Sequence, residues 1–354
     1  MEFLAEYGMF FAKTATVVFG VLLIFGNLLH FARDRDQPEK GELKIHKIND
    51  LLGEVKTQMN RATLSGKERR HATKQEKKAT KEKREKADTK TCAELQSSSD
   101  SLRSRVFYLN FKGDLQARAA NSLREEITAV LGVAQKGDEV VVNIESAGGV
   151  VHGYGFAASQ LDRVRKAGIR LTALVDKVAA SGGYMMACVA ERIHAAPFAI
   201  IGSVGVLAQL PNFRRLLEKH QIDFELHTAG EHKRTLTLFG KNTASGREKF
   251  IEDLEEAHDL FKGFIAEHRP QLDLEAIATG EIWFGSKAKQ MGLVDELETS
   301  DEYIYRKAQE QDVFEVRFEP KKTLQDRLSL SIENALTRAI AGLLERVKIN
   351  RYIS

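Results

Sequence analysis

Residues 176–188 carry the feature of this sequence that most clearly suggests chemistry. They read Asp-Lys-Val-Ala-Ala-Ser-Gly-Gly-Tyr-Met-Met-Ala-Cys and hold a single serine, Ser181. An apolar run at 171–175 predicts a buried strand before this turn, and the residues after it favour a helix. Ser181 is therefore expected at a helix N-terminus, where unpaired backbone N–H groups and the helix dipole stabilise an oxyanion. A serine in such a turn is also a common helix cap, so the local pattern leaves both interpretations open.

A second glycine-rich turn, Ser146-Ala147-Gly148-Gly149, follows a predicted strand at 139–144. In parallel sheets, ligands gather at the carboxyl ends of the strands. Two adjacent turns with unpaired N–H groups can form an oxyanion hole. Neither turn has the glycine spacing of a phosphate-binding loop. A simple structural turn remains the alternative for Gly148-Gly149.

A serine nucleophile needs a general base, and the sequence offers several. His152 follows Gly149 by three residues, but no acid stands at a position that indicates a Ser-His-Asp triad. A desolvated lysine can also serve as base, and Lys177 and Lys233 are among the candidates. Spacing alone does not choose among these residues.

The elements that must position these turns alternate between strand and helix. Strands are predicted at 106–111, 139–144 and 169–175, and helices at 122–134, with Asn121 as cap, and at 153–166. Such alternation predicts an α/β fold with a mainly parallel sheet. Further along, the patterns predict short strands within 193–207, a helix over 211–221, a strand over 222–228 and a helix over 245–269.

The composition is that of a globular protein with an uneven distribution of charge. The chain has 354 residues, 43% of them hydrophobic, and a formal net charge of +3. Residues 67–90 contain eleven Lys or Arg against five Asp or Glu, so the basic character belongs to one segment. Two cysteines, Cys92 and Cys188, are too few for a disulfide framework. No ligand cluster with metal spacing is evident, so no metal or cofactor is expected.

Residues 9–31 form a hydrophobic stretch that is long enough to cross a bilayer as one helix. No small-residue cleavage site follows it, so residues 1–32 are expected to be an uncleaved transmembrane anchor rather than a signal peptide. A buried core helix is the alternative. Basic residues after the stretch favour a cytoplasmic location for the rest of the chain, although long domains can be translocated despite flanking charge.

Between the anchor and the folded part, residues 33–104 are expected to form a spacer. Helical spacing of apolar residues predicts an amphipathic helix over 43–59, and the lysine-rich stretch after it is too polar to order itself. Without interleaved aromatic residues, this stretch favours anionic lipid headgroups over nucleic acid as a partner, and a plain solvated spacer is equally consistent. Residues 105–320 are expected to form the folded domain, and 321–354 a basic amphipathic helix.

Several motifs together resemble the signal peptide peptidase A family of membrane serine proteases. Asp176 to Tyr184 is similar to its nucleophile motif, Ile201-Gly-Ser-Val-Gly-Val206 to its next signature, and Gly230 to Thr235 to its lysine motif. The segment 280–295 resembles the closing segment shared with the ClpP/crotonase fold. The resemblance covers nearly the whole chain and implies a ClpP/crotonase-like core of repeated ββα units.

Carried over by position, the resemblance implies roles for five residues. Ser181 would be the nucleophile, Lys233 the general base and acid, and Ser203 the hydroxyl that orients the lysine. The amides of Gly149 and Gly182 would form the oxyanion hole. One departure is Ala147, where the family usually has proline.

The resemblance implies a serine endopeptidase with a Ser-Lys dyad. It also implies a homo-oligomer, and it leaves open whether the dyad is shared between subunits. The implied location is the inner membrane with a periplasmic catalytic domain, and the implied substrates are remnant signal peptides or misfolded membrane-associated proteins. Three alternatives stand beside it. A crotonase-type enzyme would not need the serine and lysine, and an α/β-hydrolase would need a histidine after His268, where none occurs. A catalytically inactive membrane scaffold could bind peptides in the same cleft.

Overall fold

The computed structural model describes residues 41–63, 104–230 and 232–321. Residues 43–319 form one compact unit, and most of the second unit, residues 1–42 with 320–354, lies outside the described residues. The predicted anchor, the lysine-rich stretch and the C-terminal helix therefore also lie outside them. Among the described residues, no helix is both long and apolar enough to cross a membrane.

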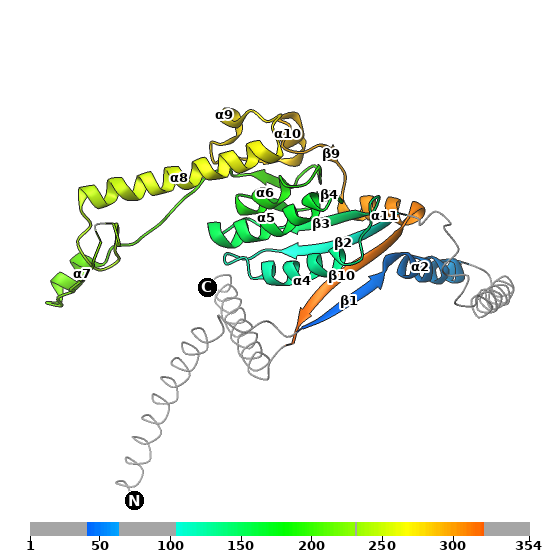
Figure 1. The fold of residues 1–354 in the computed structure, drawn as a ribbon, viewed down its shortest axis with the longest axis horizontal. Coiled ribbons are helices and arrows are strands. Elements are labelled where there is room, and N and C mark those ends of the chain that lie inside the picture. Colours follow the sequence, from blue (N-terminus) through cyan, green and yellow to red (C-terminus); the bar gives the residue numbers. More distant parts are fainter. Residues whose placement is uncertain (1–40, 64–103, 231, 322–354) are drawn as a thin grey trace, which may run out of the picture. The chain divides into compact units, whose positions relative to one another are not determined.

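The fold is built on a seven-stranded sheet and a three-stranded sheet (Figure 1). The strand order of the large sheet is β1-β10-β2-β3-β4-β6-β9, and that of the small sheet is β5-β7-β8. The pairs from β10 through β9 are parallel. The strands of the large sheet are β1 (Gly41–Lys47), β2 (Arg105–Lys112), β3 (Glu139–Glu145), β4 (Arg170–Val175), β6 (Arg192–Ala195), β9 (Glu296–Leu297) and β10 (Asp312–Pro320), and those of the small sheet are β5 (Val178–Ala180), β7 (Ile200–Gly202) and β8 (Ile282–Phe284).

Helices connect these strands along the chain. They are α2 (Ile48–Thr63), α4 (Ala119–Leu131), α5 (Val151–Lys166), α6 (Gly182–Ala187), α7 (Arg214–Lys219), α8 (Ala244–His268), α9 (Leu274–Ile277), α10 (Gly285–Gln290) and α11 (Ser300–Glu310). Strand β4 of the large sheet leads into β5 of the small sheet and then into helix α6, which is one ββα unit. The predicted α/β class is confirmed, and this mixed architecture fits a ClpP-like fold.

Alternation along the strands divides the apolar residues of the large sheet between its two faces. Phe107, Leu109, Val140 and Val142 belong to the main core together with residues of α4, α5 and α6. Their neighbours, such as Val141, belong to a smaller cluster with residues of α11. Successive side chains of a strand point to opposite faces, so the sheet is covered on both sides.

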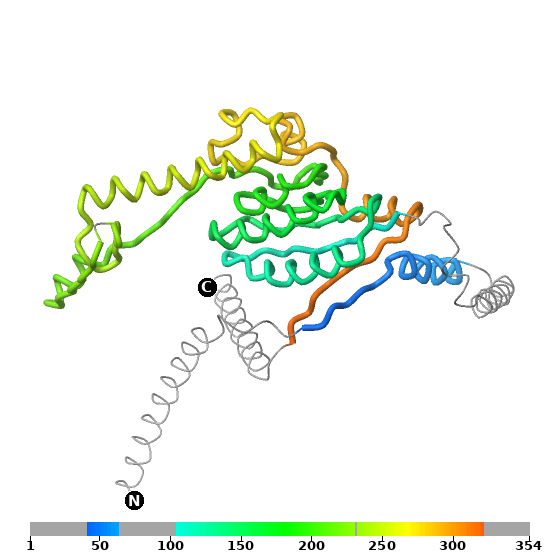
Figure 2. The backbone as a smooth tube through the Cα atoms, viewed as in Figure 1, coloured from blue at the N-terminus to red at the C-terminus, as the bar shows by residue number. Residues whose placement is uncertain are grey.

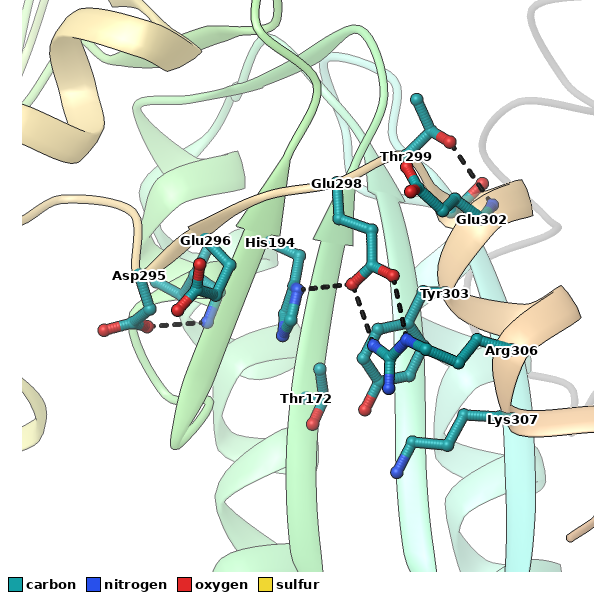
Figure 3. A network of polar contacts seen from close by, with 12 residues as sticks. Thr172, His194, Asp295, Glu296, Glu298, Thr299, Glu302, Tyr303, Arg306 and Lys307 are labelled. Carbon is teal, nitrogen blue, oxygen red and sulfur yellow. Dashed lines mark hydrogen bonds and ion pairs between the residues drawn. The ribbon is translucent and has the colours of Figure 1, made fainter. Parts of the chain in front are cut away.

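Polar contacts join α11 to the sheet, and Figure 3 shows Glu298 between His194 of β6 and Arg306 of α11. A second, buried group of contacts is centred on Glu139. Glu139 accepts hydrogen bonds from Thr172 Oγ1, Tyr303 OH and Lys307 Nζ, each at 2.6 Å. Burial acts to raise the pKa of Glu139, but these hydrogen bonds outweigh burial and the pKa is lowered. Glu139 is therefore a buried carboxylate that depends on its three donors.

Four sequence predictions need correction. Residues 43–47 are part of edge strand β1 rather than of the amphipathic helix, which spans Ile48–Thr63. Ion pairs from Lys44 to Glu319 and from Lys47 to Asp312 join this strand to β10. The partner strand lies more than 260 residues away in the sequence, so the local helical spacing could not reveal it.

The other three corrections concern the start of one helix, the length of another and a strand that does not form. Helix α4 begins at Ala119, so Asn121 lies inside its first turn and is not its cap. The strand predicted over 222–228 is absent, and the predicted 211–221 helix is shorter, at Arg214–Lys219. Ile222, Phe224 and Leu226 alternate as in a strand but are about half exposed, because no described strand or core packs against them.

Candidate functional site

The two strand ends that carry Ser181 and Ser203 lie side by side in the small sheet. Strands β5 and β7 are parallel, with Ala180 opposite Gly202. Ser181 directly follows the last residue of β5, and Ser203 directly follows the last residue of β7. The Ser181 amide donates a hydrogen bond to Gly202 O at 2.8 Å. Because neighbouring strands are separated by about 4.8 Å, this register alone makes the two serines neighbours.

Both serines have an unusual backbone conformation. Ser181 has a φ of 51° and Ser203 a φ of 52°, the left-handed region that favours glycine. Among the described residues only two other non-glycine residues, Ala117 and Gln221, have positive φ. Such conformations persist only where the surrounding structure imposes them, and they concentrate at functional sites.

The turn after β3 lies beside Ser181 on the side opposite Ser203. Ser146 N donates to Val178 O at 2.8 Å, and Ala180 N donates to Ser146 O at 3.0 Å. A Cβ added to Gly148 would come within 2.7 Å of Gly182 N, so the two turns touch through their backbones. The two glycine-rich turns thus lie close together because Ser146, after β3, pairs in parallel with Ala179 of β5.

The amides of Gly149 and Gly182 are the donors that this arrangement leaves unused. The neighbouring Gly148 amide donates to Ser146 Oγ at 3.1 Å and the Val150 amide to Leu115 O at 2.9 Å. Neither the Gly149 nor the Gly182 amide donates to another described residue. Unpaired backbone amides beside a nucleophile can stabilise an oxyanion, so these two amides are candidates for that role.

These groups open into one cavity of about 730 Å³. Gly149, Ser181, Gly182 and Ser203 all line it. Its other walls are largely apolar and come from α5, α6, α8 and the loops after β2, β3, β7 and α9. They include Leu115, Val150, Val151, Met185, Val206, Leu207, Phe261 and Ala278. Apolar walls around a few convergent polar groups are typical of a ligand-binding site.

Lys233 does not line this cavity. It lies between β7 and α8, in a stretch whose described residues from Leu207 to Arg234 are almost all exposed. Figure 2 shows this stretch leading away from the two sheets before α8 returns to them. Lys233 is itself exposed, and no described side chain donates a hydrogen bond to Ser181 Oγ. The chain therefore brings together four of the five predicted site residues and leaves the lysine outside.

The alternative bases are not placed better. His152 is exposed on α5 and does not line the cavity, and Lys177 is exposed and forms an ion pair with Glu145 at 3.0 Å. His258, which the sequence reasoning did not single out, does line the cavity from α8. His258 lies about four turns into α8, far in the sequence from Ser181, so no local pattern indicated its position at the cavity.

A buried tyrosine supports both turns and was also missed from the sequence. Tyr154 is fully buried in α5, and its hydroxyl lies 2.5 Å from Ser146 Oγ and 2.7 Å from Asp114 O. Burial raises the pKa of the Tyr154 phenol, so it remains protonated and donates to the carbonyl. Among the described residues no group of three or more His, Cys, Asp or Glu could hold a metal ion, and the expectation that no metal is needed stays a prediction.

Two models of one protease family match the sequence. Residues 2–161 match "Peptidase family S49 N-terminal" and residues 163–314 match "Peptidase family S49". Together with the α/β fold and its cavity, these matches define the class of the protein as a peptidase. The chain belongs to peptidase family S49.

Within this family the chain is similar to several proteins named "Probable protease SohB". The Haemophilus influenzae protein is 44% identical over 346 residues, which cover 96% of each chain. The protein of Buchnera aphidicola subsp. Schlechtendalia chinensis is 45% identical over 86% of this chain and 99% of its own. The protein of Buchnera aphidicola subsp. Acyrthosiphon pisum is 53% identical over 67% of this chain and 70% of its own.

Proposed function

We propose that this peptidase is a serine endopeptidase in which Ser181 is the nucleophile and Lys233 the general base and acid. The observation that carries the proposal is the register of β5 and β7, which sets two strained serines side by side at a cavity next to two unused amides. Ser203 would orient the lysine ammonium, and the amides of Gly149 and Gly182 would bind the oxyanion.

The reaction proceeds through an acyl-enzyme. Ser181 Oγ attacks the peptide carbonyl carbon and transfers its proton to neutral Lys233 Nζ, while the carbonyl oxygen becomes an oxyanion on the two amides. The C–N bond then breaks, and Lys233 Nζ returns the proton to the leaving amine. In the second half, Lys233 takes a proton from water as the water oxygen attacks the ester carbonyl, and Ser181 recovers a proton when it leaves.

We further propose that Lys233 acts on Ser181 of a neighbouring copy in a homo-oligomer. Two observations support this. Lys233 lies outside the cavity of its own chain, and the stretch that carries it exposes Leu207, Leu210, Phe213 and Leu216. Exposed apolar residues in such number are typical of an interface between proteins. Enclosure in that interface would favour the neutral form of Lys233 that the mechanism needs.

Labelling by a fluorophosphonate probe tests the dyad. We expect the probe to modify Ser181 in the full-length protein, and Ser181→Ala and Lys233→Ala each to abolish labelling and peptide hydrolysis while the variants remain folded. Unchanged hydrolysis by Lys233→Ala would contradict the role of the lysine.

Mixing the two inactive variants tests the sharing of the site. If the serine and the lysine come from different copies, random mixing in equal amounts leaves about a quarter of the sites with both residues intact, and activity returns to about that fraction. If both residues come from one chain, mixing restores nothing.

A catalytically inactive scaffold that binds peptides is the second candidate function, and the exposed position of Lys233 is the observation in its favour. The same labelling experiment separates the two. A scaffold would bind peptides but would show neither probe labelling of Ser181 nor hydrolysis in the unmodified full-length protein.

Membrane attachment is part of the proposal. Residues 9–31 would anchor the chain in a bacterial inner membrane, the lysine-rich stretch would contact anionic lipids, and the catalytic domain would lie in the periplasm, where remnant signal peptides or misfolded membrane-associated proteins are available as substrates. A reporter fused after Ser354 tests the side of the membrane. An alkaline phosphatase fusion is expected to be active, and activity of a cytoplasmic reporter there would reverse the assignment.

A further inference from the structure

Tyr154 touches both of the turns that carry the unused amides. Its side chain is fully buried, and it lines the cavity from α5 together with residues of the two turns. A Cβ added to Gly182 would overlap Cβ and the ring of Tyr154, so the ring lies directly against the Gly182 backbone. At the far end of the same side chain, the Tyr154 hydroxyl contacts Ser146 of the turn 146–149.

The hydroxyl belongs to a hydrogen-bonded chain whose direction follows from its ends. The carbonyl of Asp114 can only accept, so the single Tyr154 proton is donated to it, at 2.7 Å. The Tyr154 oxygen must then accept from Ser146 Oγ, at 2.5 Å, and Ser146 Oγ in turn accepts from the Gly148 amide, at 3.1 Å. This chain consumes the Gly148 amide and leaves that of Gly149 unpaired.

The surroundings allow this chain little freedom. Ser146 is 2% exposed, and a Cβ added to Gly113 would lie against both Tyr154 OH and Ser146 Oγ, so the backbone closes over the pair. Phe111 packs edge-on against the tyrosine ring, with centroids 6.3 Å apart. A closed hydrogen-bonded chain in a buried site holds its members in one geometry.

We propose that Tyr154 is a positioning residue that sets both oxyanion amides at once, that of Gly182 by ring contact and that of Gly149 through Ser146 and Gly148. This inference rests on the proposed function, because it assigns Tyr154 a task in the reaction of Ser181. Tyr154 does not touch the reacting atoms. Its effect is confined to the transition state, where charge develops on the oxygen held by the two amides.

The test is a kinetic comparison of Tyr154→Phe with the full-length protein. The variant keeps the ring against Gly182 and removes only the hydroxyl. We expect kcat for a peptide substrate to fall by about 10-fold to 100-fold, and the rate of Ser181 modification by a fluorophosphonate to fall in parallel. KM should change by less than about 2-fold, because an interaction made only in the transition state is lost.

Tyr303→Phe is the matched control. Tyr303 is also a buried tyrosine whose hydroxyl makes a short hydrogen bond, to Glu139 at 2.6 Å, but it lies on α11 and does not line the cavity. We expect both variants to lower Tm, and only Tyr154→Phe to lower kcat. Equal kcat in the two variants would overturn the proposal, because the hydroxyl would then serve stability alone.

Ser146→Ala provides a second route if Tyr154→Phe does not fold. It breaks the same chain while leaving the tyrosine, and by itself it should lower kcat with little change in KM. Where both single variants fold, the double variant should lose little more activity than the more damaging of the two. Losses that multiply would overturn the proposal. Full-length protein that neither hydrolyses peptides nor reacts with the probe would refute the proposed function and the role of Tyr154 with it, whereas a reactive protein with an unaffected Tyr154→Phe variant would refute the role of Tyr154 alone.

Discussion

At the scale of single residues, the backbone conformation of Ser181 distinguishes a site residue from a helix cap better than its residue type does. A serine that caps a helix typically has an extended backbone, whereas Ser181 has φ 51° and ψ −120° and makes no side-chain capping bond. The capping interpretation that the sequence left open is therefore not supported. The strained conformation is held by pairing of the Ser181 amide with Gly202 and by the contact of its neighbour Gly182 with Tyr154.

Ala147 offers a test of how rigid the first turn needs to be, since the resembling family usually has proline there. Ala147 is exposed, and its amide donates no hydrogen bond to a described residue. We expect Ala147→Pro to raise the free energy of unfolding by about 0.5–1 kcal/mol, because proline restricts the unfolded chain, and to leave kcat equal or higher. Urea unfolding and peptide hydrolysis measure the two effects. A destabilised variant would show that the backbone of this turn does not accommodate proline.

Glu126 predicts a specific dependence of stability on pH. Burial raises the pKa of this carboxyl from 4.5 to about 7, even though it accepts a hydrogen bond from Phe318 N at 2.8 Å. The unfolded chain loses this proton at lower pH than the folded chain does, so stability falls as pH rises from about 4.5 to about 7. The loss is on the order of 3 kcal/mol.

Glu126→Gln removes the titration and retains an acceptor for Phe318 N. We expect the variant to be more stable than the unmodified protein above about pH 7 and similar to it near pH 4.5, as measured by urea unfolding across this range. Glu125→Gln, at the partly exposed neighbouring residue, is the control and should keep the original slope. The same slope in Glu126→Gln would contradict the assignment of the pH dependence to this carboxyl.

At the scale of elements, the network in Figure 3 attaches α11 to the sheet through charged groups rather than through apolar contacts alone. In addition to the contacts drawn there, Lys307 and Glu139 form a buried ion pair, with side chains 14% and 6% exposed and Nζ and Oε2 2.6 Å apart. His194 lies 3.0 Å from Glu298, and burial lowers its pKa despite that neighbour. The attachment thus depends on complete pairing of a few buried charges.

Removing one partner of that pair should be severe. We expect Lys307→Met to lower the free energy of unfolding by about 3–5 kcal/mol, because Glu139 remains buried without its cation. Lys289→Met breaks an exposed pair with Glu296 at 3.0 Å and should lower it by less than about 1 kcal/mol. Denaturant unfolding measures both. If both substitutions had a similarly small effect, the hydroxyls of Thr172 and Tyr303 alone would suffice to stabilise the buried Glu139 carboxylate.

At the scale of the whole molecule, the cavity that contains Ser181 does not contain Lys233, which lies instead on an exposed segment of the same chain. The proposed oligomer reconciles the two, and Leu216 on α7 tests it because this side chain is 53% exposed. We expect Leu216→Glu to shift the mass in solution towards the monomer and to lower peptide hydrolysis in parallel, with little change in unfolding. Light scattering and hydrolysis rates measure the two effects.

Tyr305→Glu, at an exposed residue of α11, is the control and should change neither the mass in solution nor the hydrolysis rate. A Leu216→Glu variant that dissociates but stays fully active would contradict the shared site.

The sequence by itself determined the α/β class, most of the central strands and helices, and the two glycine-rich turns. Strand alternation, helical spacing and turn residues are local properties, and the elements they predicted between 106 and 175 lie within a few residues of those observed. The same local rules failed where the partner was distant or missing, at strand β1 and at residues 222–228.

Only the tertiary structure decided how the site is assembled. The proximity of Ser203 to Ser181 follows from the register of β5 and β7, and the support of both turns by Tyr154 follows from the packing of α5 against α6. The sequence also gave no sign that Lys233 lies outside the cavity of its own chain. Each of these relations joins segments distant along the chain, and such contacts are fixed by strand pairing and by the packing of helices, which no local pattern encodes.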